Sequence, residues 1–145
     1  MKRRVMIIGA TQSGKSTLAN ALNEEKRALK KTQDVIYGKE TIDTPGSYLE
    51  NVQMYRYLIA TAQSASKVVL LVSAAKPQQG YPPGFAKVFR CPVIGVISKC
   101  DLAPENVAAA FRQLKSSGVE EACFALDLTA ERELLPLKEI LFRKE

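Results

Sequence analysis

The sequence has no histidine and no tryptophan, and it has only three cysteines among its 145 residues. Without histidine, the chain cannot use an imidazole as a general base, a nucleophile or a metal ligand. The cysteines, Cys91, Cys100 and Cys123, are odd in number and lack the C-x-x-C spacing of zinc and redox sites. We therefore expect reduced thiols, which are typical of a cytoplasmic protein.

Long apolar runs are missing as well. The first run, residues 5–10, is too short for the hydrophobic region of a signal peptide. We expect no membrane span, because no run approaches the roughly 18 apolar residues that a span requires. Hydrophobic residues make up 46% of the chain and charged residues 25%, as in ordinary globular proteins. The length suits one small domain that covers residues 1–145.

Positive charge exceeds negative charge, since 21 lysines and arginines against 15 aspartates and glutamates give a net charge of +6. This balance favours anionic partners, among them nucleotides, nucleic acid and acidic protein surfaces. The basic residues cluster at residues 2–4 and 26–31, where solvated faces would also explain them. No aromatic residue is interleaved with these clusters, so nucleic acid is the partner that we least expect.

Apolar runs typical of strands alternate with helix-like segments. The predicted strands cover residues 5–8, 33–37, 40–43, 67–72, 93–97 and 122–126, and the predicted helices cover residues 15–25, 49–64, 104–116 and 131–143. Residues 74–83 are rich in proline, glycine and glutamine and should form a loop. Gly118 should end the third helix, and Pro136 should kink or delay the fourth. The alternation predicts a three-layer α/β fold with a mostly parallel sheet and one antiparallel edge strand at residues 33–37.

The strongest motif is Gly9-Ala10-Thr11-Gln12-Ser13-Gly14-Lys15-Ser16, which matches G-x-x-x-x-G-K-[ST] between a predicted strand and a predicted helix. Its glycines allow a tight turn whose backbone N–H groups point into one concavity, beside the positive end of a helix dipole. Lys15 should reach the β- and γ-phosphates of a nucleotide, and the Ser16 hydroxyl should ligate Mg²⁺. The predicted phosphate-binding residues are these eight together with Thr17.

A second motif, Asp43-Thr44-Pro45-Gly46, follows the strand predicted at residues 40–43. An aspartate at the end of a strand can hold Mg²⁺ through a water molecule, and the Gly46 N–H can bond to the γ-phosphate. Alone, this tetrapeptide is a common turn. Its place after the phosphate loop favours Asp43 as a metal ligand and Gly46 as a phosphate-binding residue.

A third motif, Ser98-Lys99-Cys100-Asp101, follows the strand predicted at residues 93–97. It resembles the [NT]-K-x-D motif with which GTPases recognise their base. The Asp101 carboxylate can accept from both N1–H and the 2-amino group of guanine, a donor pair that adenine lacks. The Lys99 stem can lie over the base. Ser98, where the GTPase pattern has Asn or Thr, keeps a hydroxyl that can hold neighbouring loops together.

In this order, the three motifs resemble those of small GTPases of the translation-factor-related class, and the chain is most similar to the ethanolamine- and propanediol-utilisation GTPase family. The resemblance covers nearly the whole chain, including Lys31-Thr32-Gln33, Tyr48 and Val96-Ile97-Ser98-Lys99. It implies a P-loop NTPase fold of the G-domain type, binding of GTP or GDP with Mg²⁺, and GTP hydrolysis. It also implies a role beside bacterial microcompartment enzymes. Acetate kinase activity has been attributed to the family, so phosphate transfer to acetate is the alternative function.

The resemblance suggests further site residues. Thr32 is the candidate switch threonine, which would complete the Mg²⁺ shell and act with Lys15 on the reacting phosphate; Thr41 is its rival, within a strand that should be rigid. For the fifth GTPase motif, the Leu128 N–H would bond to guanine O6, and the neighbouring pair Thr129-Ala130 is the alternative.

The residue after D-T-P-G is Ser47, where many GTPases have a glutamine that orients the attacking water. Serine is too short for this role, and the chain has no histidine to replace it. We therefore expect slow hydrolysis that a partner would stimulate. The partner would be a microcompartment shell protein, an enzyme or a second copy of the chain. Tyr48, Tyr55 and Tyr57 are candidates for its docking surface, although helix packing also explains Tyr55.

Overall fold

The structure, a computed structural model, describes residues 4–10, 13–23, 36–37, 41–44, 52–76, 81–120 and 122–142. Its strands are β1 (Val5–Gly9), β2 (Ile36–Tyr37), β3 (Thr41–Asp43), β4 (Lys67–Ser73), β5 (Val93–Ser98) and β6 (Cys123–Ala125). They lie in the order β2-β3-β1-β4-β5-β6, and all neighbours are parallel except β2 with β3. The predicted α/β fold with one antiparallel edge strand is confirmed; residues 33–35 of that strand lie outside the described residues.

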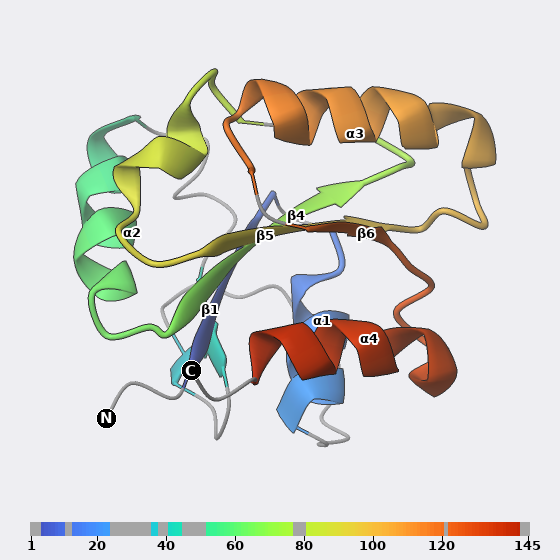
Figure 1. The fold of residues 1–145 in the computed structure, drawn as a ribbon, viewed down its shortest axis with the longest axis horizontal. Helices are drawn as coiled ribbons and strands as arrows, with labels where there is room; N and C mark the ends of the chain where they lie inside the picture. The colour runs from blue at the N-terminus through green and yellow to red at the C-terminus, as the bar shows by residue number, and fades with distance from the viewer. Residues whose placement is uncertain are drawn as a thin grey trace.

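Helices cover both faces of the sheet (Figure 1). Helices α1 (Lys15–Asn23) and α4 (Glu131–Leu141) pack on one face, and α2 (Tyr55–Ala62) and α3 (Val107–Ser116) pack on the other. The inner strands therefore bury both of their faces, which explains their continuous apolar runs. In β4, for example, Val68 and Leu70 belong to the core under α2 and α3, whereas the alternating residues Val69 and Leu71 belong to the core under α1 and α4.

The connection between β4 and β5 continues beyond the loop predicted at residues 74–83. Its described part contains a short 3-10 helix, η3 (Phe85–Val88), and a group of aromatic rings. Phe85 contacts three rings: Tyr55 at 5.1 Å, Tyr81 at 5.4 Å and Phe89 at 5.5 Å between centroids. Parallel strands are usually joined by an α-helix that covers the sheet. Here the aromatic group covers it beside α2.

Several helix ends also differ from the sequence prediction. Helix α3 begins at Val107 because residues Pro104–Asn106 form a 3-10 turn, η4. Helix α2 begins at Tyr55 after the 3-10 turn η2 (Val52–Met54). Gly118 has φ +99° just beyond α3, as its predicted role in ending that helix requires. Helix α4 begins at Glu131, as predicted, and continues through Pro136, so the proline does not delay it.

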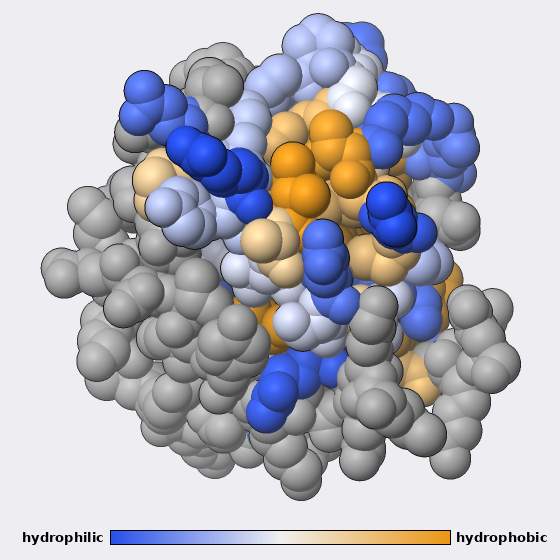
Figure 2. Space-filling model, turned by 90° about the vertical axis from the view of Figure 1, so that its left-hand side faces the viewer, coloured by the Kyte–Doolittle hydropathy of each residue, from blue (hydrophilic) through white to orange (hydrophobic). Residues whose placement is uncertain are grey.

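The face that carries α2 has apolar residues near its centre and hydrophilic residues around them (Figure 2). Tyr55 is half-buried there against Phe85, so packing accounts for it, whereas the Tyr57 side chain is 54% exposed. Tyr48 lies outside the described residues. Among the helices that the structure describes, none has the length and apolar character to cross a bilayer.

Candidate nucleotide-binding site

The phosphate loop begins at Gly9, where β1 ends against β4. A Cβ atom on Gly9 would lie 2.6 Å from Ser13 Oγ and 3.2 Å from Leu71 O, so only glycine fits without a shift. The loop is closed by a turn in which Ser13 N–H donates to Ala10 O at 3.1 Å. Ser13 Oγ is buried and has no hydrogen-bond partner among the described residues. A buried hydroxyl of this kind needs a partner, and a phosphate oxygen would supply one.

Gly14 ends the loop with φ +102°, a conformation that other residues rarely adopt. Its carbonyl accepts from Leu18 N–H at 2.9 Å, so α1 starts directly after the loop. The N–H groups of the first turn and the positive end of the helix dipole favour an anion there. Ser16 and Thr17 lie half-buried in that first turn.

Lys15 folds back across the loop. Its side chain is buried, and Nζ donates to Ala10 O at 3.2 Å. Burying an ammonium group is costly unless polar groups surround it. Together with the Ser13 hydroxyl and the N-terminus of α1, this buried positive charge fits the phosphates of a nucleotide.

Asp43 ends β3 beside the phosphate loop. It is buried and is paired with Ile7 of β1 in the parallel register. The adjacent Thr44 Oγ1 donates to Ile7 O at 2.7 Å, which holds the end of β3 against β1. Carboxylate and hydroxyl oxygens are the hard ligands that Mg²⁺ prefers. Asp43 and Ser16 therefore fit a magnesium ion shared with a nucleotide.

The last residue of β5, just before the base loop, contacts the phosphate loop directly. Ser98 Oγ donates to Ser13 O at 2.6 Å, which confirms that this hydroxyl holds two loops together. Lys99 follows with φ +58°, a left-handed conformation that is uncommon outside glycine and is found mainly where function requires it. Leu102 N–H donates to Lys99 O at 3.1 Å and closes the turn, on which Asp101 is exposed.

The loop before α4 lies against the same end of the phosphate loop, at Gly14. Leu128 is buried, and its Cδ1 lies 3.1 Å from the position of a Cβ on Gly14. Asp127 Oδ1 accepts from Thr129 N–H at 2.9 Å and from Thr129 Oγ1 at 2.6 Å. The Thr129 hydroxyl is the main cause of the lowered pKa of Asp127, followed by the amide. Thr129 thus shapes the turn, and Leu128 faces the loop.

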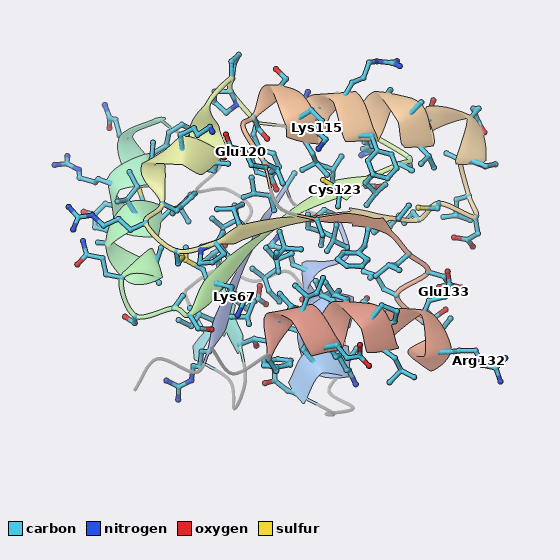
Figure 3. All side chains as sticks on the ribbon, viewed as in Figure 1. Lys67, Lys115, Glu120, Cys123, Arg132 and Glu133 are labelled. Atoms are coloured by element: carbon cyan, nitrogen blue, oxygen red, sulfur yellow. The ribbon has the colours of Figure 1, made fainter. Side chains whose placement is uncertain are left out.

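Cys100 lies in the turn after β5, and Cys123 lies in β6. Burial raises the pKa of Cys100, and its Sγ donates to Ile97 O at 3.3 Å. Cys123 lies between the sheet and α3, on the side of Lys115 (Figure 3), and burial raises its pKa too. A raised pKa keeps both thiols protonated, as expected for packed side chains rather than reactive ones.

Two residues at the site belong to no motif, and the sequence analysis missed them. Tyr81 is buried, and its hydroxyl proton is shared between two acceptors, Leu71 O at 2.7 Å and Ile8 O at 2.9 Å. Asn106 Nδ2 donates to Ala74 O at 3.0 Å, and Ala74 N–H donates to Ser98 O at 2.8 Å. Both roles depend on contacts between segments far apart in the chain, so no local pattern indicates them.

Some predicted site residues lie outside the described part of the chain and stay predictions: Thr11, Gln12, Thr32 and Gly46. Among those described, the structure brings Ser13, Gly14 and Ser98 together. It pairs Asp43 with Ile7 of β1, two residues before Gly9.

Comparison with known proteins agrees with this arrangement. The family model for ethanolamine utilisation and propanediol utilisation proteins, PduV-EutP, matches residues 1–142. The chain is 36% identical over 135 residues to the propanediol utilization protein PduV of Citrobacter freundii, which covers 91% of this chain and 90% of that protein. It is 35% identical over 127 residues to the "Probable acetate kinase EutP" of Escherichia coli K12, which covers 86% of this chain and 80% of that protein.

More distant relatives are GTPases. The GTPase Era of Caldanaerobacter subterraneus is 33% identical over 133 residues, which covers 77% of this chain and 45% of Era. The translation elongation factor SelB of Methanococcus maripaludis, solved with the GTP analogue GppNHp, matches with a TM-score of 0.69 at 19% identity over 96% of this chain and 32% of SelB. A probable GTP-binding protein, EngB, matches with a TM-score of 0.64 at 19% identity over 96% of both chains. The fold is therefore that of P-loop GTPases.

Proposed function

Because the chain belongs to the PduV-EutP family of ethanolamine- and propanediol-utilisation proteins, we propose that it is a small GTPase that binds GTP or GDP with Mg²⁺. One observation carries the proposal: the 2.6 Å hydrogen bond from Ser98 Oγ to Ser13 O. It joins the loop that would read the base to the loop that would hold the phosphates, so one ligand can contact both. That ligand lies where open α/β sheets bind theirs, outside the carboxyl ends of the strands.

The phosphates would lie in the loop of residues 9–16. Ser13 Oγ and the first N–H groups of α1 would donate to phosphate oxygens, and Lys15 Nζ would exchange its bond with Ala10 O for the β- and γ-phosphates. Ser16 and Asp43, with Thr32, are the residues that would hold Mg²⁺, whose charge offsets that of the phosphates.

The base would lie against the loop after β5. Asp101 would accept from N1–H and the 2-amino group of guanine, and the left-handed turn at Lys99 lets its stem cover the base plane. The Leu128 N–H would donate to guanine O6. Adenine has no N1–H and no 2-amino group, and it carries an amino group where guanine has O6, so the site should select GTP over ATP.

Hydrolysis by the isolated protein should be slow. Ser47 cannot orient the attacking water as glutamine does, and the chain has no histidine to substitute for it. A slow GTPase that needs a stimulating partner suits a switch or an assembly accessory. The utilisation roles in the relatives' names support a place in the cytoplasm beside a microcompartment, with a shell protein, an enzyme or a second copy as partner.

A kinase is the second candidate function, because 86% of the chain also matches a protein named as a probable acetate kinase. In that reaction the γ-phosphate of the nucleotide would pass to acetate instead of water. The same phosphate loop would serve both reactions, so product analysis must separate them.

The test is titration of the protein with GTP, GDP and ATP, followed by product analysis with and without acetate. We expect tight binding of GTP and GDP, weak binding of ATP, and inorganic phosphate as the product. Lys15→Ala should fold normally and lose about 10- to 150-fold in affinity, the value of one charge-assisted contact. Equal binding of ATP and GTP would overturn the base assignment, and acetyl phosphate as the main product would favour the kinase.

A further inference from the structure

The last two carbonyls of β1 before the phosphate loop each accept a hydrogen bond from a side-chain hydroxyl. Ile7 O accepts from Thr44 Oγ1 at 2.7 Å, and Ile8 O accepts from Tyr81 OH at 2.9 Å. Thr44 belongs to the D-T-P-G motif, so its presence here follows from the nucleotide site. Tyr81 belongs to no motif and comes from the connection between β4 and β5.

The Tyr81 hydroxyl lies where β1 and β4 separate. Its single proton is shared between Ile8 O and the nearer Leu71 O at 2.7 Å, and Leu71 is the β4 partner of Gly9 in the parallel ladder. The hydroxyl therefore bridges the two strands at this point. The phenol is held in place from two sides. Its ring stacks on Phe85 with 16° between the ring planes, and its backbone N–H donates to Gln113 Oε1 of α3 at 3.2 Å.

This hydroxyl acts on the peptide at which the loop leaves the sheet. Ile8 C=O and Gly9 N–H belong to one planar peptide unit, so fixing the carbonyl fixes the direction of the N–H. The main chain at Gly9 is closely packed against the loop, because a Cβ on Gly9 would lie only 2.6 Å from Ser13 Oγ. A rotation of this peptide would therefore move the loop itself.

We propose that Tyr81 is a positioning residue for the phosphate-binding loop, its buried hydroxyl orienting the Ile8–Gly9 peptide so that the loop keeps its shape for the nucleotide β-phosphate. This inference rests on the proposed function. Burial raises the pKa of Tyr81, so the phenol stays protonated and keeps donating at neutral pH. In this role Tyr81 acts through the main chain, because its hydrogen-bond partners among the described residues are the carbonyls of Ile8 and Leu71 and the side chain of Gln113.

The test compares Tyr81→Phe with the wild-type protein in titrations with GTP, GDP and GMP. Phenylalanine keeps the ring contact with Phe85 and removes the donor. We expect GTP and GDP to bind about 3- to 10-fold more weakly, the value of one neutral hydrogen bond, and GMP to change less because it lacks the β-phosphate. Ser117→Ala is the matched control, since its buried hydroxyl donates to Leu114 O at 2.7 Å at the end of α3. It should lower stability without changing any nucleotide affinity.

The outcomes separate this inference from the proposed function. If the wild-type protein binds no guanine nucleotide, the proposed function fails and the role of Tyr81 fails with it. Suppose that the wild-type protein binds GDP. If Tyr81→Phe then binds GDP equally well, or if its affinity for GMP falls by the same factor as its affinity for GDP, only the role of Tyr81 is refuted. Should Tyr81→Phe not fold, Gln113→Ala replaces it, because it removes the acceptor of the Tyr81 N–H. Gln113→Ala should lower the affinity for GDP more than the affinity for GMP, and unchanged affinity for both nucleotides would refute the inference.

Discussion

Replacing Ser98 with alanine removes a buried hydrogen bond that joins the base loop to the phosphate loop. Ser98 is 1% exposed, and its Oγ donates to Ser13 O at 2.6 Å. Water cannot easily reach Ser13 O to replace the lost donor. The same carbonyl lies one residue before Gly14, whose φ of +102° sets the entry into α1. The variant therefore weakens the loop at its most constrained point.

The expected cost follows from the burial of this bond. A typical neutral hydrogen bond contributes about 0.5–1.5 kcal/mol, and a buried acceptor left without a donor costs about 1–3 kcal/mol. We expect Ser98→Ala to lower the free energy of unfolding by about 1–2 kcal/mol. Since the loop must then be ordered by the ligand, GDP should also bind about 5- to 10-fold more weakly. Ser98→Thr keeps a hydroxyl and should therefore retain most of the wild-type free energy of unfolding and most of the affinity for GDP.

Urea unfolding of the nucleotide-free protein and calorimetric titration with GDP measure the two effects. Ser117→Ala provides the comparison, because it removes an equally buried serine hydroxyl remote from the loops. It should lower stability by a similar amount and leave the affinity for GDP unchanged. If Ser98→Ala resembles Ser117→Ala in both measurements, the bond stabilises the fold alone and does not join the two loops for the ligand.

Three other outcomes are expected. Asp101→Asn should bind GTP more weakly and xanthosine triphosphate more tightly in competition titrations, because an amide can donate to the 2-oxygen of xanthine; an unchanged preference would contradict the base assignment. Gly14→Ala should lose about 1–3 kcal/mol of stability in urea, since it forces φ +102° on alanine against Leu128; wild-type stability would refute that geometry. Burial raises the pKa of Tyr81 above its ordinary value of 10.0, so above pH 10 the unfolded chain releases a proton that the folded protein retains. The free energy of unfolding of the wild-type protein should therefore fall there by about 1.4 kcal/mol per pH unit more than that of Tyr81→Phe. Parallel pH profiles of the two proteins would disprove this.

The fold was predictable from the sequence where local pattern and burial agree. Strands buried on both faces, such as β4 and β5, appear as continuous apolar runs. The motif glycines mark the strand–loop–helix unit because their backbone conformations exclude other residues, as the φ of Gly14 shows. The role of Ser98 was also foreseen, because a hydroxyl in the place of Asn or Thr keeps a donor of similar reach.

The connection between β4 and β5 could not be predicted in the same way. Its proline, glycine and glutamine content indicated a loop, and local composition carries no information on the partners of Tyr81. Those partners are Ile8, 73 positions earlier in the chain, and Gln113, 32 positions later. The short helix η3 depends likewise on the contact between Phe85 and Tyr55 of α2. Contacts of this separation decide the structure wherever local preference is weak.

The phosphate loop is held from three sides by groups that act on its main chain rather than on its variable side chains. Tyr81 acts on the carbonyl before Gly9, Ser98 on the carbonyl of Ser13, and Leu128 lies against Gly14. These supports come from the β4–β5 connection, from β5 and from the loop before α4, and they draw on the cores on both faces of the sheet. A loop fixed in this way is shaped before its ligand arrives, so little binding free energy is lost in ordering it. Binding can then favour the folded state in proportion to ligand concentration, by about 2.7 kcal/mol at a hundred times Kd.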